Sequence, residues 1–152
     1  MRKFEVVADK FRQVPGAKVV LPTRGTKGSA AYDFRALQSV DIKPGQLVSF
    51  PTDIKANMEQ DEVLLINVRS SMGFKKRLRL VNTQGWIDSD FYNNPDNDGN
   101  IGIGLYNFGT ETVHIGAGDR IAQGMFIKYL TVDDEERVTK VRQGGIGSTG
   151  TN

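Results

Sequence analysis

Residues 101–129, which read IGIGLYNFGTETVHIGAGDRIAQGMFIKY, decide the fold class of this chain. They contain three runs rich in β-branched and aromatic residues, at 101–107, 112–115 and 121–129. Two glycine-containing turns, Asn-Phe-Gly-Thr and Gly-Ala-Gly-Asp, separate the runs. Short apolar runs between such turns are typical of β-strands. The stretch therefore predicts three consecutive strands.

The same pattern continues through the rest of the chain, with Pro-Gly pairs supplying further turns. Several short strands at close spacing predict an all-β sandwich, jelly roll or barrel. One short helix is expected at residues 70–76, with a serine as its N-cap. The further runs that predict strands are residues 4–8, 17–21, 32–36, 46–50, 63–68 and 78–81.

Length and composition limit the classes of protein that this chain can be. At 152 residues it is expected to form one domain. The absence of cysteine excludes a disulfide scaffold, a cysteine-based zinc site and a thiol nucleophile. No apolar run is long enough to span a membrane, and no signal-peptide core follows Arg2 and Lys3. We therefore expect a soluble, cytoplasmic protein.

The net charge of +2 comes from 20 basic and 18 acidic residues mixed along the chain. Such a balance does not call for a nucleic-acid partner. The basic run at residues 75–79 could touch a polyanion, but a solvated turn or helix end accounts for it better. The single histidine, His114, lies in an alternating stretch and is expected on a strand surface.

Three segments combine residue types that suit phosphate chemistry. Residues 69–73 (RSSMG) open the expected helix, where free N–H groups, two hydroxyls and a guanidinium favour an anion. Residues 85–91 (GWIDSDF) place two acids beside aromatic side chains, so that one acid could act as a general base. Residues 118–124 (GDRIAQG) form a turn that enters a strand. An ordinary N-cap, an Asx-rich hairpin and an Asp119–Arg120 pair at a corner explain the same segments without any function.

The C-terminal residues 142–152 (RQGGIGSTGTN) are rich in glycine. Glycines leave backbone N–H groups accessible, and consecutive exposed amides can form an anion-binding nest. Arg142 adds a guanidinium that suits phosphate oxygens. The tail is therefore interpreted as an arm that closes over a phosphorylated ligand, although a frayed terminus would have the same composition.

Together these segments resemble the dUTPase family, the trimeric deoxyuridine triphosphate nucleotidohydrolases. The five motifs of this family appear in order and span most of the chain. One such motif alone is weak, whereas five in register are specific. The matching segments are residues 30–34 (AAYDF), 69–73, 82–91 (NTQGWIDSDF) and 118–123, and Arg142 with residues 144–150 (GGIGSTG).

The resemblance implies a jelly-roll-like (β-clip) fold with one short helix, assembled as a homotrimer with swapped C-terminal arms. A β-rich core would span residues 1–136, and the arm with its Gly-rich motif would span residues 137–152. The arm would close over an active site built by neighbouring subunits. The implied activity is that of a dUTP diphosphatase, which hydrolyses dUTP to dUMP and pyrophosphate.

The resemblance also assigns roles in catalysis. Asp88 would be the general base that activates a water for attack on the α-phosphorus. Mg²⁺ would be bound mainly by the three phosphates and by water, with Asp33 in its outer shell. The residues implied to hold the triphosphate are Arg69, Ser70, Ser71 and Gln123.

Uracil would be read by the backbone between Asn82 and Asp88, with help from the Asn82 amide. Backbone donors and acceptors on a tight hairpin can mimic the pairing edge of adenine, leave no room for the methyl group of thymine, and reject cytosine by leaving buried groups unpaired. Phe91 would lie under the deoxyribose. The other residues implied to contact the substrate are Gly85, Trp86, Ile87, Arg142, Ile146, Gly147, Ser148 and Thr149.

The chain departs from the family pattern at three places. Phe91 replaces the usual tyrosine, and the adjacent Tyr92 is a candidate to compensate for the lost hydroxyl. Ile146 replaces a phenylalanine that would stack on uracil, so dUTP binding is expected to be weaker by roughly 1 kcal/mol. Residues 93–100 (NNPDNDGN) form a polar surface loop that is longer than the family's connection after the third motif.

Two alternatives to a simple dUTPase are considered. A dCTP deaminase shares the fold and has a similar third motif, but Gly104 stands where the deaminase needs a glutamate base. A phage-type dUTPase that also binds a regulatory protein is the second alternative, with residues 93–100 as the candidate surface. Nucleic-acid binding through residues 75–79 is the least favoured hypothesis.

Overall fold

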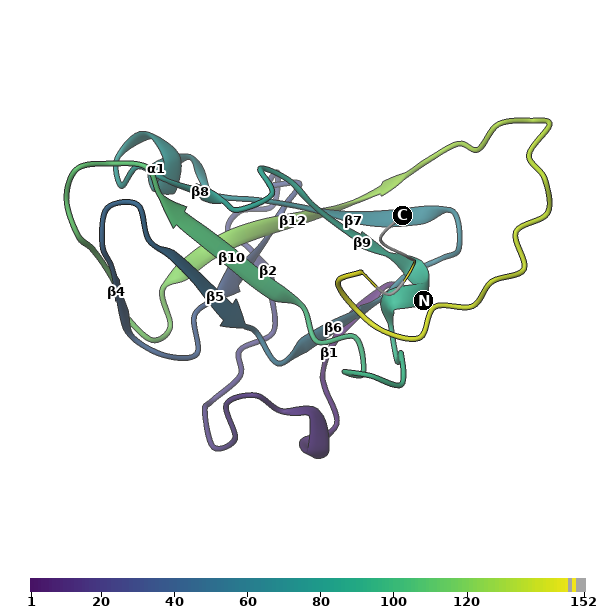
Figure 1. The fold of residues 1–152 in the computed structure, drawn as a ribbon, viewed down its shortest axis with the longest axis horizontal. Coiled ribbons are helices and arrows are strands. Elements are labelled where there is room, and N and C mark those ends of the chain that lie inside the picture. The colour runs from purple at the N-terminus through teal and green to yellow at the C-terminus, as the bar shows by residue number, and fades with distance from the viewer. Residues whose placement is uncertain (148, 150–152) are drawn as a thin grey trace.

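The computed structural model describes residues 1–147 and 149, and its ribbon is drawn in Figure 1. Within this part of the chain, strands dominate and four sheets form. The largest sheet has the strand order β2-β3-β12-β7-β9, and a smaller one has the order β5-β10-β8. The strands of these two sheets are β2 (Thr23–Arg24), β3 (Tyr32–Arg35), β5 (Leu47–Pro51), β7 (Glu62–Asn67), β8 (Leu78–Leu80), β9 (Gly85–Asp88), β10 (Gly102–Asn107) and β12 (Arg120–Lys128).

Two pairs of strands complete the fold. The antiparallel pairs are β1 (Lys3–Val6) with β6 (Ile54–Asn57), and β4 (Val40–Ile42) with β11 (Val113–Ile115). The short helical elements are η1 (Asp9–Phe11), α1 (Ser70–Phe74) and η2 (Ser89–Phe91). In the described residues, no helix has both the length and the apolar character needed to cross a membrane.

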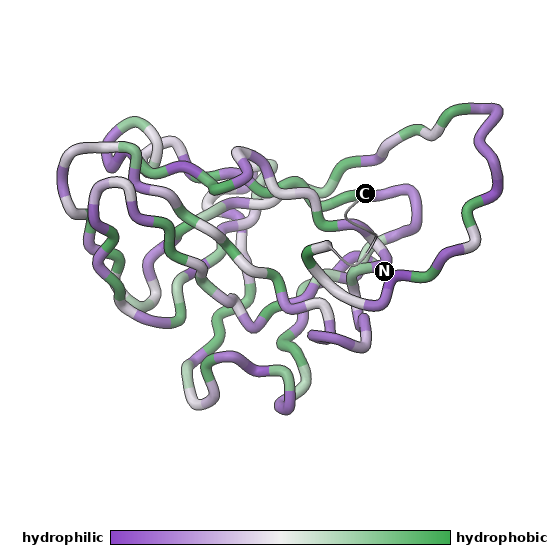
Figure 2. The backbone as a smooth tube through the Cα atoms, in the orientation of Figure 1, coloured by the Kyte–Doolittle hydropathy of each residue, from purple (hydrophilic) through white to green (hydrophobic). Residues whose placement is uncertain are grey.

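The core lies between the five-stranded sheet and the β5-β10-β8 sheet. Leu64 and Ile66 of β7 face inward, whereas Leu65 and Asn67 alternate to the outer face. Leu105 of β10 is completely buried in the same cluster. Each such side chain contributes about 1.5–3 kcal/mol relative to an exposed one. Figure 2 shows the corresponding alternation of hydrophobic and hydrophilic residues along the strands.

The chain after β12 has a different character. Residues 129–141 contain no helix or strand and are exposed throughout. Figure 1 shows this segment leaving the body of the molecule and returning toward β9, and Figure 2 shows a hydrophilic stretch where it lies farthest out. Among the described residues, the last strand therefore ends at Lys128. The division into a core at residues 1–136 and an arm at 137–152 stays a prediction.

Most of the strands expected from the sequence are confirmed, and the exceptions have physical reasons. Residues 17–21 are not in a strand, and Pro22 directly follows them. Proline lacks an N–H donor, which a ladder requires. Four short strands were not expected: β2, β4, β6 and β9. Each has polar residues on its outer side, which shortens the apolar run that signals a strand.

The helix and the polar loop also differ from expectation. The helix ends at Phe74 rather than residue 76, and its N-cap is Arg69, with no side-chain capping hydrogen bond. The serine cap was therefore wrong. The expectation of a polar surface loop at residues 93–100 was also wrong for Asn94, Asp98 and Asn100, whose side chains are buried in a hydrogen-bond network. His114 lies exposed on β11, as expected.

Candidate active site

A row of polar side chains crosses the outer face of the five-stranded sheet. Gln123 on β12 lies in register with Asp33 on β3 and with Asn67 on β7. Residues opposite each other on neighbouring strands share one face of a sheet. Gln84, just before β9, extends the row by donating from Nε2 to Oδ1 of Asn67 at 3.3 Å. The outer face of the sheet therefore carries a continuous row of polar side chains across neighbouring strands.

This row forms the floor of a cavity of about 630 Å³. The cavity lies within the size range of small-molecule sites. Its walls combine the loop after β2 with two arginine side chains. The polar residues that line it include Thr26, Ser29, Asp33, Asn67, Arg69, Arg120 and Gln123.

Asp33 holds both of these arginines. Its Oδ1 lies 3.0 Å from Nε of Arg69, and its Oδ2 lies 3.3 Å from Nη1 of Arg120. The Asp33 side chain is 10% exposed, whereas those of Arg69 and Arg120 are 28% and 41% exposed. A guanidinium carries five N–H donors, so each arginine keeps donors beyond this ion pair. The arrangement presents two fixed positive charges to the cavity.

Ser70 and Ser71 follow Arg69 at the start of α1. Ser70 is exposed and Ser71 is half-buried. Neither residue caps the helix, so their hydroxyls are not used to satisfy its first turn. Ser70 and Ser71 are thus adjacent in sequence to the cavity-lining Arg69, but the structure does not place either serine in the cavity lining.

Asp88 lies at the end of β9, outside the cavity lining. Its side chain is 56% exposed, and its Oδ2 lies 2.6 Å from Nη2 of Arg142. Nε of the same arginine lies 2.7 Å from Oδ1 of Asp90. The guanidinium carbon also lies 6.0 Å from the centre of the Phe91 ring. The arm thus returns to Asp88 of its own chain, and closure on a neighbouring subunit stays a prediction.

The remaining residues predicted to bind uracil surround β9. Gly85 pairs with Ile66, and a Cβ at Gly85 would lie 3.3 Å from Cβ of Ile66. Trp86 is 60% exposed, and Ile87 packs partly against the core. Asn82 is exposed in the turn before β9, where its carbonyl accepts a bond from the N–H of Gln84 at 2.7 Å. Within one chain, the structure does not bring this group into the cavity with Asp33, Arg69 and Gln123.

The arm residues that are predicted to contact the substrate differ in exposure and in their contacts. Gly144 is buried, and a Cβ at this position would lie 3.0 Å from Cβ of Asp96. Ile146 is fully exposed, and Gly147 has a φ of +78°. The carbonyl of Thr149 accepts a bond from Nζ of Lys140 at 2.9 Å. Ser148 lies outside the described residues.

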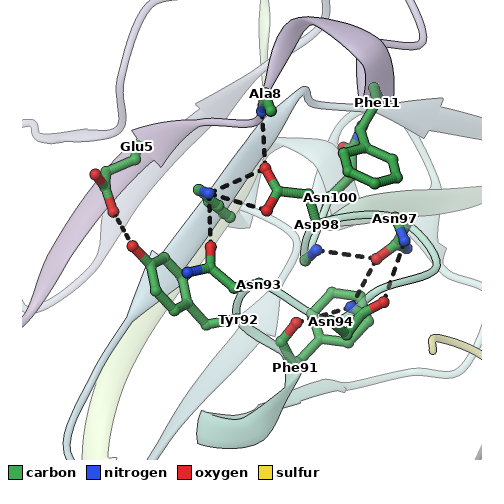
Figure 3. A network of polar contacts seen from close by, with 12 residues as sticks. Glu5, Ala8, Phe11, Phe91, Tyr92, Asn93, Asn94, Asn97, Asp98 and Asn100 are labelled. Atoms are coloured by element: carbon green, nitrogen blue, oxygen red, sulfur yellow. Dashed lines mark hydrogen bonds and ion pairs between the residues drawn. The ribbon is translucent and has the colours of Figure 1, made fainter. Parts of the chain in front are cut away.

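Tyr92 does not compensate for the hydroxyl that Phe91 lacks. Its hydroxyl donates to the Glu5 carboxylate on β1 (Figure 3). This hydrogen bond raises the pKa of Tyr92 and lowers that of Glu5. The suggestion that Tyr92 serves the site is therefore wrong, because the hydroxyl already has a structural partner.

Asn67, Gln84 and Arg120 are among the cavity residues that sequence reasoning missed. Asn67 is a polar residue at the end of a buried strand, and this signal was available. Gln84 precedes β9, a strand that was not expected. Arg120 was considered a partner of Asp119, but it pairs with Asp33, and the Asp119 carboxylate instead accepts the N–H of Gly116 at 2.8 Å.

The fold and the cavity define a β-protein with a rigid, arginine-lined site for an anionic ligand. Comparison with known proteins gives the family. The dUTPase family model matches residues 17–150. The deoxyuridine 5'-triphosphate nucleotidohydrolase of Lactococcus lactis is 44% identical over 151 residues, covering 99% of this chain and 98% of that protein. The corresponding protein of Desulfotalea psychrophila is 35% identical over 136 residues, covering 86% of this chain and 87% of that protein.

Solved structures agree with the sequence comparison. The crystal structure of dUTPase from Streptococcus mutans superposes with a TM-score of 0.74 at 38% identity, covering 86% of this chain and 98% of that chain. The dUTPase from phage phi11 of S. aureus has a TM-score of 0.70 at 20% identity, covering 92% of this chain and 97% of that chain, and supports the fold alone. The chain belongs to the dUTPase family.

Proposed function

We propose that this protein hydrolyses dUTP to dUMP and pyrophosphate, with Asp88 as the general base. The observation that carries the proposal is the pair Arg69 and Arg120, held by Asp33 over the polar floor of the cavity. Two fixed guanidiniums beside a neutral amide suit a polyphosphate, because bidentate arginine–phosphate contacts combine charge with geometry. Family membership supplies the identity of the nucleotide.

In the proposed reaction, Asp88 accepts a proton from a water while the water oxygen bonds to the α-phosphorus. The bond from the α-phosphorus to the oxygen that bridges to the β-phosphorus breaks, and pyrophosphate leaves with that oxygen. The exposure of Asp88 supports this role, because water and substrate can reach its carboxylate. Arg142 would have to exchange its contact with Asp88 for a phosphate contact as the substrate binds.

The phosphates would be held by residues from two neighbouring elements. Arg69, Ser70 and Ser71 would contact them from the start of α1, with Ser70 closest to the α-phosphate. Gln123 would donate its amide N–H groups from the sheet. The support is the presence of Arg69 and Gln123 in the cavity lining and the position of the two serines directly after Arg69.

Magnesium would accompany the triphosphate, where it would neutralise charge on the phosphate oxygens. Both oxygens of Asp33 already face guanidiniums, at 3.0 and 3.3 Å. Among residues 1–147 and 149, no group of three or more histidine, aspartate and glutamate side chains forms a metal cage. This donor set fits an ion carried by phosphates and reached by Asp33 through water. A structural Mg(II) ion is named for the phage phi11 enzyme.

Uracil would be read by the backbone of residues 82–88, with the Asn82 amide assisting and Phe91 lying under the deoxyribose. Gly85, Trp86 and Ile87 would provide the donors and acceptors. From the arm, Ile146 would cap the base, while Arg142, Gly147, Ser148 and Thr149 would contact the phosphates. The exposure of Asn82 and Ile146 supports this proposal, since both can reach a ligand.

A homotrimer with shared active sites would bring the cavity residues Asp33, Arg69 and Gln123 together with Asp88 and the residues predicted to bind uracil. The cavity group and the Asp88 group are separate within one chain, so a second copy could bring them together. An apolar row on the outer face of the sheet, formed by Met125, Leu65 and Trp86 in register, supports such a contact. Met125 is 37% exposed and Trp86 is 60% exposed in the single chain.

The deaminase alternative meets a steric obstacle. A Cβ at Gly104 would lie 2.9 Å from Cγ2 and 3.4 Å from Cβ of Val81. A glutamate at the position where a deaminase would need one therefore requires the Val81 side chain to move. A regulatory protein partner stays a prediction.

The test of the proposed function is incubation of the purified protein with Mg²⁺ and dUTP, dCTP, dTTP or UTP, with pyrophosphate and ammonia measured together. Pyrophosphate from dUTP alone is expected. Ammonia from dCTP would support deamination instead. Equal pyrophosphate release from dUTP and dTTP would contradict the proposed reading of uracil by residues 82–88.

A further inference from the structure

Residues 93–100, hereafter the Asn-rich loop, close on themselves through side-chain hydrogen bonds (Figure 3). Oδ1 of Asn94 accepts the N–H groups of Asp96 and Asn97, each at 3.1 Å. Oδ1 of Asn97 accepts Nδ2 of Asn94 at 2.7 Å and the N–H of Gly99 at 3.0 Å. The loop therefore has a defined shape, although it contains no helix or strand.

The Asn-rich loop is also fixed to the body of the protein. Asp98 lies 2.9 Å from Nζ of Lys55 on β6, and it accepts the N–H of Ala8 at 2.7 Å. Asn100 donates to Asp53 at 2.9 Å. Gly99 has a φ of +86°, and a Cβ there would lie 2.8 Å from the carbonyl oxygen of Phe91. These anchors hold the loop against two other segments of the chain, at Ala8 and at residues 53–55.

The same loop contacts both Phe91 and the arm. Nδ2 of Asn94 donates to the carbonyl of Phe91 at 2.8 Å. A Cβ at Gly144 would lie 3.0 Å from Cβ and 3.1 Å from Oδ2 of Asp96, so a larger residue at this position would push against the Asp96 side chain. A Cβ at Gly145 would lie 3.5 Å from Nδ2 of Asn97 and 3.6 Å from the Phe91 ring.

We propose that the Asn-rich loop is the surface on which the Gly-rich arm docks, with Asp96 and Asn97 as positioning residues. The loop would hold the arm so that Arg142 and the residues after it face the ligand. This inference rests on the proposed function, in which the closed arm covers dUTP. Under this proposal, the residues that make the loop longer than the family's usual connection position the arm, and the arm in turn binds the substrate.

The test combines two substitutions and measures the docked state directly. Trypsin cleavage after Arg142 reports docking, because this side chain is only 13% exposed when it lies on Asp88 and Asp90. Cleavage after the exposed Arg137 is the internal reference. Gly144→Ala is expected to raise the rate after Arg142 roughly tenfold, since the added methyl group overpacks the contact with Asp96. Gly102→Ala is the matched control, because a Cβ there meets nothing within 4 Å.

A second substitution distinguishes a specific contact from general damage. Asp96→Gly removes the side chain that the added methyl group would meet, so the double variant Asp96→Gly, Gly144→Ala is expected to return most of the way to the wild-type rate. The KM for dUTP should follow the same order, raised in Gly144→Ala and restored in the double variant. Both changes are present in every chain, so the rescue is expected whichever copy supplies the arm.

Unchanged cleavage in Gly144→Ala, or release of the arm without rescue by Asp96→Gly, would overturn the proposal. Cleavage is measured without ligand and with the imido analogue of dUTP. If the analogue does not bind and dUTP is not hydrolysed, the proposed function fails. The ligand-free rates would still support or overturn docking on the Asn-rich loop.

Discussion

Asp53 and Asp88 show two uses of a carboxylate in one small protein. Asp53 has no exposed side-chain surface, and it accepts the N–H groups of Gln13 and Val14 at 2.8 and 3.1 Å. Nε of Arg12 and Nδ2 of Asn100 complete its partners. Asp88 is 56% exposed and faces a guanidinium from the distant arm. The first carboxylate is enclosed by the folding of the chain, and the second is left open.

The difference lies in where the donors come from. Backbone N–H groups near Asp53 are fixed by the fold, so this carboxylate cannot change partners without local unfolding. The donors beside Asp88 belong to the Arg142 side chain of the arm, which can turn toward phosphate oxygens when a ligand arrives. A carboxylate that serves a reaction is thus expected to have exchangeable partners. Substitutions at both kinds of position can test this contrast.

Asp88→Asn should reduce turnover of dUTP by about 10²–10⁴-fold, because an amide cannot accept the proton from water. The free energy of unfolding should stay within about 0.5 kcal/mol of wild type, as for most exposed sites. Steady-state kinetics and urea unfolding measure the two quantities. Asp134→Asn, in the exposed segment after β12, is the control that should retain full activity. Turnover preserved in Asp88→Asn would remove Asp88 from the role of base.

Asp53→Asn should lower the free energy of unfolding by about 3 kcal/mol, because it leaves buried donors facing an amide N–H group. Urea unfolding followed by far-UV circular dichroism measures the change. Asp9→Asn, on the exposed surface of η1, is the matched control and should have little effect. If Asp53→Asn lowers the free energy of unfolding no more than the control does, the hydrogen-bond network around Asp53 does not stabilise the fold.

The stabilisation by Asp53 should disappear in acid. Burial raises the pKa of Asp53, but the bonds donated by Gln13, Asn100, Val14 and Arg12 outweigh burial and lower the pKa below its ordinary value of 3.8. A carboxyl with a lowered pKa in the folded state stabilises fully above its unfolded pKa, and this stabilisation is lost as the pH falls through the folded value. The stability difference between wild type and Asp53→Asn should therefore be constant near neutrality and shrink below about pH 4. Unfolding curves from about pH 7 to about pH 2.5 would test this, and a constant difference would contradict it.

Ile146→Phe should tighten binding of dUTP by roughly 1 kcal/mol, equivalent to about a fivefold lower Kd, if the added ring stacks on uracil. Ile146 is fully exposed, so the change should not alter the unfolding free energy. Isothermal titration with the imido analogue of dUTP measures the affinity. Unchanged affinity would mean that the arm approaches the base from another direction.

The sequence allowed the fold class to be predicted because long apolar runs such as residues 63–68 and 121–129 coincide with β7 and β12. It did not reveal β6, whose outward Lys55 is bound to Asp98 far along the chain. The shape of residues 93–100 was equally hidden. Asparagine and aspartate are typical of exposed loops, and only long-range partners such as Asp53 and Lys55 make these residues internal.

Only part of the candidate site could be predicted, because the pairing of distant strands is not visible in the local sequence. The motif pattern identified Asp33, Arg69 and Gln123 separately, and the structure brings them into one cavity. Arg120 was assigned to its sequence neighbour Asp119, because the pairing of β3 with β12 that carries it to Asp33 is not visible in the local sequence. Side chains that depend on strand register are thus the ones that a linear reading misses.

Gly104 bears on how enzymes of this fold can exchange activities over evolutionary time. A Cβ at position 104 would lie 2.9 Å from Cγ2 of Val81, so glutamate at this position requires the half-exposed Val81 side chain to move. Residues in contact do not change independently, so the tolerance of position 104 is expected to depend on the residue at position 81. A change of activity that needs a carboxylate at position 104 is therefore expected to be easier after a smaller residue has appeared at position 81.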